Sequence, residues 1–68
     1  MMIEWKDGFE ISVRMENGAV VISANKEGLL SLALQLAALA EAPPGSHIHY
    51  DADNSLEDGS AELIIEKT

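Results

Sequence analysis

The stretch from Phe9 to Ala24 constrains the fold most, because it carries a complete β-hairpin pattern. Apolar and polar side chains alternate strictly from Phe9 to Met15, which is the period of a strand with one buried face. Asn17-Gly18 follows, and both residue types tolerate the positive φ of a two-residue type I′ turn. A turn at this point forms three apolar cross-strand pairs, Met15 with Val20, Val13 with Ile22 and Ile11 with Ala24. The pattern therefore predicts a hairpin with one apolar face.

A helix is predicted after the hairpin, and Pro43-Pro44-Gly45 ends it. Asn25 is a suitable N-cap, and Glu27 lies in the first turn, where a negative charge interacts favourably with the helix dipole. The apolar stripe expected to pack on a sheet consists of Leu29, Leu32, Leu36 and Leu39, with Ala33 and Ala40. The outer face is expected at Ser31, Gln35 and Ala38.

Two further leucines, Leu30 and Leu34, widen the apolar arc of this helix. They lie about 100–140° around the axis from Leu29, so the arc exceeds half of the circumference. Either a strongly curved sheet covers this flank or another chain does. If both side chains were exposed, the protein would lose about 3–6 kcal/mol of the stabilisation that burying them provides. This is a large fraction of a small domain's stability. We therefore predict Leu30 and Leu34 as a candidate homodimer interface.

Two strands are predicted after the helix, one around His47–Asp51 and one over Ser60–Lys67. A short N-terminal strand is also expected, with a Lys6-Asp7-Gly8 loop that brings Trp5 beside Phe9. The order is strand-strand-helix-strand-strand. It predicts an α+β fold, in which a mainly antiparallel sheet of four or five strands carries the helix on one face.

The strand before the acidic loop sends His47, His49 and Asp51 to one face and Ile48 and Tyr50 to the other. Two histidines and a carboxylate could bind zinc or iron, transfer protons or dock a partner. Side chains two residues apart start about 6.5–7 Å apart, so three ligands in a row meet with strain. No cysteine, nucleophilic serine or Gly-rich phosphate loop accompanies them. We therefore expect that the protein is not an enzyme and binds no metal or cofactor. The remaining interpretations of this face are a docking surface for a partner and a solvated face without a function.

The overall charge restricts the partners. Twelve acidic residues and four basic ones give a formal net charge of −8. Nucleic acid and acidic membranes are therefore unfavourable partners, whereas a basic protein surface would be attracted. The absence of cysteine excludes disulfides and thiolate zinc sites. We expect one small domain over residues 1–68 in the cytoplasm, because no signal peptide and no bilayer-spanning run is visible.

Three segments, Glu27–Ala40, Gly45–Asp51 and Asn54–Lys67, together resemble a family of small predicted immunity proteins from bacterial polymorphic-toxin loci. The most specific pieces are Gly-Ser-His-Ile-His, which begins at Gly45, and the Leu-Glu-x-Gly-Ser-x-Glu-Leu run, which begins at Leu56. The resemblance implies a cytoplasmic α+β protein that binds and blocks one toxin. It carries over no catalytic residue.

The favoured hypothesis is an immunity protein that associates with a basic toxin domain. Partner-binding residues are expected on the histidine-bearing strand and the acidic loop: His47, His49, Asp51, Asp53, Glu57 and Asp58. One alternative is a homodimeric regulatory or structural domain that uses the flank of Leu30 and Leu34. A second alternative is a metal-binding protein with histidine and carboxylate ligands.

Overall fold

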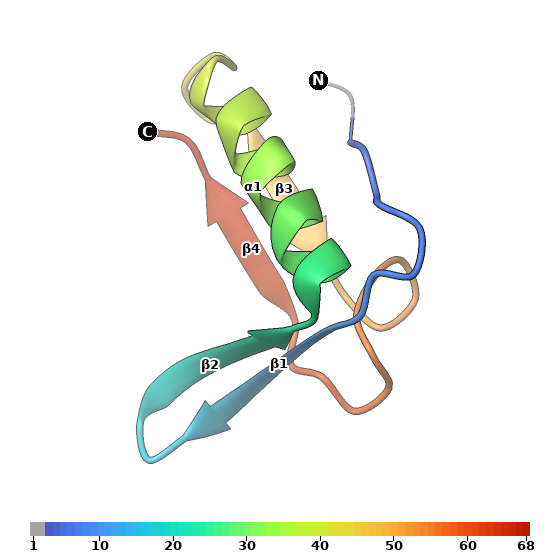
Figure 1. Cartoon of the computed structure of the whole chain (residues 1–68). Coiled ribbons are helices and arrows are strands. Elements are labelled where there is room, and N and C mark those ends of the chain that lie inside the picture. The colour runs from blue at the N-terminus through green and yellow to red at the C-terminus, as the bar shows by residue number, and fades with distance from the viewer. Residues whose placement is uncertain (1–2) are drawn as a thin grey trace.

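The computed structural model describes residues 3–68, and it contains four strands and one helix. The elements are β1 (Ile11–Glu16), β2 (Ala19–Ala24), α1 (Lys26–Ala40), β3 (His47–Tyr50) and β4 (Leu63–Glu66). β1 pairs with β2, and β3 pairs with β4, both antiparallel. In Figure 1, α1 lies in front of β3, β4 runs to the left of the helix, and the β1–β2 hairpin extends away from it. The α+β class is therefore as predicted.

The expected single sheet of four or five strands is wrong, because the chain forms two separate two-stranded sheets. The free edge of β1 is occupied by the loop before β4. The Glu57 N–H donates to the Ile11 carbonyl at 2.9 Å, and the Ala61 N–H donates to the Val13 carbonyl at 2.8 Å. These contacts are four residues apart in the loop but two apart in β1. The loop bulges between them, so no regular ladder joins the two sheets.

The predicted hairpin is confirmed in register and in turn geometry. Met15 pairs with Val20, Val13 with Ile22, and Ile11 with Ala24. Asn17 and Gly18 have φ values of 50° and 83°, as a type I′ turn requires. Ile11 and Val13 are buried, whereas Met15, Val20 and Ile22 toward the tip are exposed. The apolar face of the hairpin is therefore covered only at its base.

The N-cap of α1 is also confirmed, and it joins the helix to β1. The Asn25 Oδ1 accepts from the Gly28 N–H at 2.8 Å and from the Glu10 N–H at 3.0 Å. The Asn25 Nδ2 donates to the Gly8 carbonyl at 2.9 Å. One side chain thus satisfies an N–H group at the start of the helix and fixes the segment that enters the hairpin.

The predicted orientation of α1 is wrong for six residues. Leu32 and Leu39 are buried as expected, but the rest of the predicted stripe is exposed: Leu29, Ala33, Leu36 and Ala40. Ser31 and Gln35, which were expected on the outer face, are almost completely buried. The helix is therefore rotated, so that part of its polar side faces the core and much of its leucine side faces solvent.

Hydrogen bonds to the N-terminal segment explain this rotation. The Ser31 Oγ accepts from the Lys6 N–H and donates to the Glu27 carbonyl, both at 2.8 Å. The Gln35 Nε2 donates to the Glu4 carbonyl at 2.8 Å. In the predicted N-terminal strand, these backbone groups would have bonded to a neighbouring strand. Polar side chains of α1 bond to them instead.

The expected N-terminal strand is absent from residues 3–8. Met1 and Met2, which precede it, lie outside the described residues. The predicted loop is nevertheless present, since Gly8 has a φ of 81° and the Phe9 N–H donates to the Lys6 carbonyl. Trp5 stacks on Phe9 with ring centroids 4.4 Å apart, so the expected neighbours meet without a ladder.

The core lies between α1, the base of the hairpin and the inner face of β3. It consists of Ile11, Val13, Leu32, Leu39, Ile48, Tyr50 and Leu56. Ile48 and Tyr50 are buried, as the alternation of β3 predicts, and Tyr50 is fully buried. Its hydroxyl donates to the Gln35 Oε1 at 2.7 Å, so the phenol has a polar partner inside the core.

The stability of the protein is expected to fall at alkaline pH. Burial raises the pKa of the Tyr50 hydroxyl above its ordinary value of 10.0, so the folded state holds this proton more tightly than the unfolded chain. The resulting stabilisation is complete below the ordinary pKa and is lost as the pH rises through the folded-state pKa. Tyr50 is the only tyrosine, so phenolate absorbance reports its titration alone. A native midpoint at the ordinary pKa would contradict this prediction.

Candidate functional site

His47 and His49 lie on the exposed side of β3, where the alternation placed them. Their ring centroids are 6.3 Å apart, and the rings are inclined by 74°. The His49 Nε2 lies 3.8 Å from the Glu62 Oε2, and the cross-strand neighbour of His47 is Glu66. All of these side chains are exposed. The face therefore mixes imidazole and carboxylate groups that are free to meet a partner.

A hollow of about 330 Å³ lies beside this face. It is lined by Ile3, Trp5, His47, Ile48, His49 and Asn54. The sequence pattern placed Trp5 with the core and did not associate it with the histidines. The N-terminal segment comes beside β3 because Ser31 and Gln35 bind its backbone, a contact for which the sequence contains no local signal.

Asp51 has a structural role in the loop that follows β3. Its Oδ1 accepts from the N–H groups of Asp53 and Asn54, both at 3.0 Å. The Asp51 carbonyl accepts from three following N–H groups. The Asn54 Nδ2 in turn donates to the His49 carbonyl at 3.0 Å. Asp51 is thus engaged within its own turn, which is the behaviour of an Asx-type turn residue.

The acidic loop is held to the rest of the protein by Leu56 and by two hydrogen bonds that follow it in the chain. Leu56 is buried in the core, and the Glu57 N–H is bound to the Ile11 carbonyl. The Ser60 Oγ accepts from the Val13 N–H at 3.1 Å. The exposed carboxylates of Asp53, Glu57 and Asp58 therefore project from a backbone that is held in place. Such preorganisation reduces the entropy lost when a partner binds.

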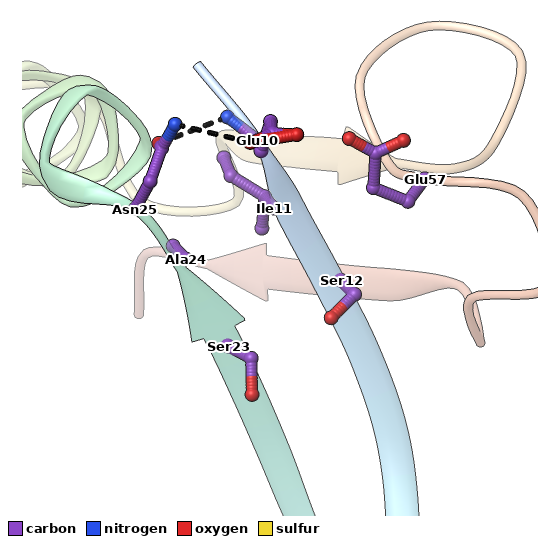
Figure 2. Close-up of a pocket in the computed structure, with 7 residues that line it drawn as sticks. All are labelled: Glu10, Ile11, Ser12, Ser23, Ala24, Asn25 and Glu57. Atoms are coloured by element: carbon purple, nitrogen blue, oxygen red, sulfur yellow. Dashed lines mark hydrogen bonds between the residues drawn. The ribbon is translucent and has the colours of Figure 1, made fainter.

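Glu57 shares a second hollow with Glu10, and the sequence did not predict this pairing. The hollow has a volume of about 320 Å³ and is lined by Glu10, Ile11, Ser12, Ser23, Ala24, Asn25 and Glu57. Figure 2 shows Glu10 and Glu57 on neighbouring segments near the top of β1, with Ser12 and Ser23 farther along the strands. Two carboxylates and two hydroxyls give this hollow an acidic, hydrogen-bonding rim. Its chemistry suits a cationic side chain.

Within residues 3–68, no group of three or more His, Asp or Glu side chains is arranged to hold a metal ion. The same part of the chain has no helix that is long and apolar enough to cross a bilayer. The predicted partner-binding residues therefore fall into two places: His47 and His49 on β3, and Asp53, Glu57 and Asp58 on the loop. Asp51 lies between them and organises the turn.

These features define the class of this molecule, a small acidic α+β protein with an anchored and charged surface that suits protein binding. A family model described as Immunity protein 32 matches residues 19–68. The chain belongs to the Immunity protein 32 family, which confirms the predicted immunity-protein kinship. No curated protein and no solved structure matches the chain.

Proposed function

We propose that this protein neutralises a cognate bacterial toxin by binding it through the acidic loop and the neighbouring histidine face. The observation that carries the proposal is the anchored loop, which holds Asp53, Glu57 and Asp58 exposed on a fixed backbone. An immunity protein has to recognise one partner, and a rigid constellation of charges discriminates between partners better than a mobile tail. The family match supports the same function.

The toxin proposed as partner presents a basic surface. The chain has a formal net charge of −8, and complementary charge increases the rate of encounter. The hollow between Glu10 and Glu57 could receive an Arg or Lys side chain, and Ser12 and Ser23 offer further hydrogen bonds. His47 and His49 would also contact the partner, and Trp5 lines the hollow beside them. Binding of this kind blocks the toxin without catalysis or a cofactor, and the proposal places it in the cytoplasm.

The direct test is the association of a Glu57→Ala/Asp58→Ala variant with the cognate toxin domain. We expect the association rate at low ionic strength to fall about tenfold, because two carboxylates that steer the encounter are lost. The difference should shrink at high salt, where the field is screened. Stopped-flow fluorescence measures both rates.

A matched control removes two carboxylates elsewhere, as Glu16→Ala/Glu41→Ala. Both residues are exposed, and the Glu16 ion pair with Arg14 lies on the surface, where such pairs contribute little to stability. This variant should associate at nearly the wild-type rate. If both double variants slow association equally, only the net charge matters, and the acidic loop is not the binding surface.

A further inference from the structure

The outer face of α1 is apolar and uncharged, and neither sheet covers it. From Gly28 to Ala40 the helix contains no charged residue. Leu29, Leu30, Leu34 and Leu36 are 55%, 45%, 42% and 44% exposed. Ala33, Ala37 and Ala40 on the same side of the helix are also exposed. An apolar surface of this kind on a small protein is typical of an interaction site.

The rotation that exposes these leucines is determined by several independent contacts. Gln35 bonds both the Tyr50 hydroxyl and the Glu4 carbonyl, and Ser31 bonds the Lys6 N–H. Gly28 lies so close to β1 that a Cβ at this position would be 2.6 Å from the Glu10 carbonyl oxygen. The helix therefore cannot turn its leucines inward without leaving buried polar groups unsatisfied.

We propose that this face binds the same face of a second copy of the chain, so that the protein forms a two-fold symmetric dimer. The lack of charge on this face allows this occupant to approach. Two molecules that each have a net charge of −8 repel one another, and an uncharged helix face is where they can approach with the fewest carboxylates in contact. A basic toxin surface would gain no ionic contact on this face, whereas the acidic loop offers several.

The shape of the face is self-complementary. At 100° per residue, Ala33 and Ala37 lie between one row that contains Leu29 and Leu36 and another that contains Leu30 and Leu34. In an antiparallel pair, a leucine row of one helix can fit into the alanine groove of the other. Identical faces then meet across a two-fold axis, as in most homodimers. The axis would pass near Ala33, close to the middle of the exposed leucines.

The size of the face indicates how tight this dimer should be. The uncharged part of α1 is about 20 Å long and one helix wide. A standard interface buries about 800 Å² on each partner, which is more than one short helix provides. We therefore expect a weak, reversible dimer that is populated at high micromolar concentration. This inference does not depend on toxin binding.

Sedimentation velocity over a range of concentrations tests the proposal. The wild-type protein should pass from monomer to dimer, and Leu30→Glu/Leu34→Glu should weaken association at least a hundredfold by placing carboxylates in an apolar interface. The matched control is Met15→Glu/Val20→Glu, which adds the same charge at exposed apolar positions on the hairpin. It should dimerise like the wild type, apart from a modest effect of added charge. Circular dichroism verifies that each variant is folded.

Cross-linking locates the interface without disrupting it. The chain has no cysteine, so Ala33→Cys introduces a single thiol at the expected axis. Mild oxidation should give a disulfide-linked dimer, whereas Ala19→Cys at the start of β2 should remain largely monomeric. A wild-type protein that stays monomeric at high micromolar concentration would overturn the proposal. So would equal cross-linking by both cysteine variants, or loss of toxin binding in Leu30→Glu/Leu34→Glu when the wild type is monomeric.

Discussion

Tyr50→Ala is expected to lower the free energy of unfolding by about 3–5 kcal/mol, the cost of removing a large aromatic side chain from a packed core. A domain of this size has a total stability of about 3–10 kcal/mol, so this substitution alone should remove a third or more of it. Urea denaturation followed by circular dichroism measures the change. A loss below about 1 kcal/mol would contradict the assignment of Tyr50 to the centre of the core.

The effect is large because Tyr50 joins three parts of the molecule. Its side chain is fully buried, and its ring meets Trp5 edge-on, with ring centroids 6.2 Å apart. Its hydroxyl donates to Gln35, which also donates to the Glu4 carbonyl. Alanine at this position would open a cavity, release Trp5 and leave the buried Gln35 Oε1 without a donor. These three losses act in the same direction.

Tyr50→Phe separates the hydrogen bond from the packing. It keeps the ring but leaves the Gln35 Oε1 unsatisfied, which should cost about 1–3 kcal/mol. Adding Gln35→Leu removes the orphaned acceptor, although the Glu4 carbonyl then loses its donor. A double-mutant cycle gives the coupling between the two side chains. Zero coupling would show that the Tyr50–Gln35 hydrogen bond contributes nothing to stability.

Gly28→Ala is expected to destabilise the protein by about 1–3 kcal/mol, although alanine is the better helix former. A Cβ at Gly28 would lie 2.6 Å from the Glu10 carbonyl oxygen, 2.9 Å from the Ile11 Cγ1 and 3.0 Å from the Ala24 Cβ. The Glu10 carbonyl cannot move away freely, because it accepts from the Asn25 N–H at 3.1 Å. The steric clash should therefore outweigh the gain of about 1 kcal/mol in helix propensity.

The matched control for this prediction is Ala37→Gly, on the exposed side of the same helix. This control replaces alanine with glycine, the reverse of Gly28→Ala. Helix propensity alone therefore predicts that stability falls by about 1 kcal/mol in Ala37→Gly and rises by the same amount in Gly28→Ala. Destabilisation by both substitutions would identify close packing at Gly28 as the cause. A stabilised Gly28→Ala variant would contradict the close approach of α1 to β1.

Local features of this fold were predictable because neighbouring residues determine them. The Asn17-Gly18 turn determines the hairpin register through the φ values that these residues tolerate. Asn25 caps α1 through an N–H group three residues away. The alternation in β3 places Ile48 and Tyr50 inside and His47 and His49 outside. Each of these contacts is local in the chain or repeats with the period of a strand.

The rotation of α1 was not predictable from its own pattern. A hydrophobic stripe predicts which side of a helix is most apolar, and here the apolar arc is so wide that it hardly restricts the orientation. Ser31 and Gln35 decided the outcome, since their partners Lys6 and Glu4 lie at least 25 residues earlier in the chain. Leu30 and Leu34 are exposed as expected for an interface, but Leu29 and Leu36 join them.

The features of the candidate site also fall into two groups, those that the sequence predicts and those that depend on the tertiary structure. The sequence by itself determined the acidic charge, the exposed histidines and the acidic character of the loop, because composition and strand alternation require no knowledge of distant contacts. Only the tertiary structure decided that Glu57 lies beside Glu10 and that Trp5 lies beside the histidines. Both neighbourhoods depend on hydrogen bonds between segments far apart in the chain, from Glu57 to Ile11 and from α1 to the N-terminal segment. Such contacts form wherever a buried backbone group needs a partner, and no local pattern records which partner it will find.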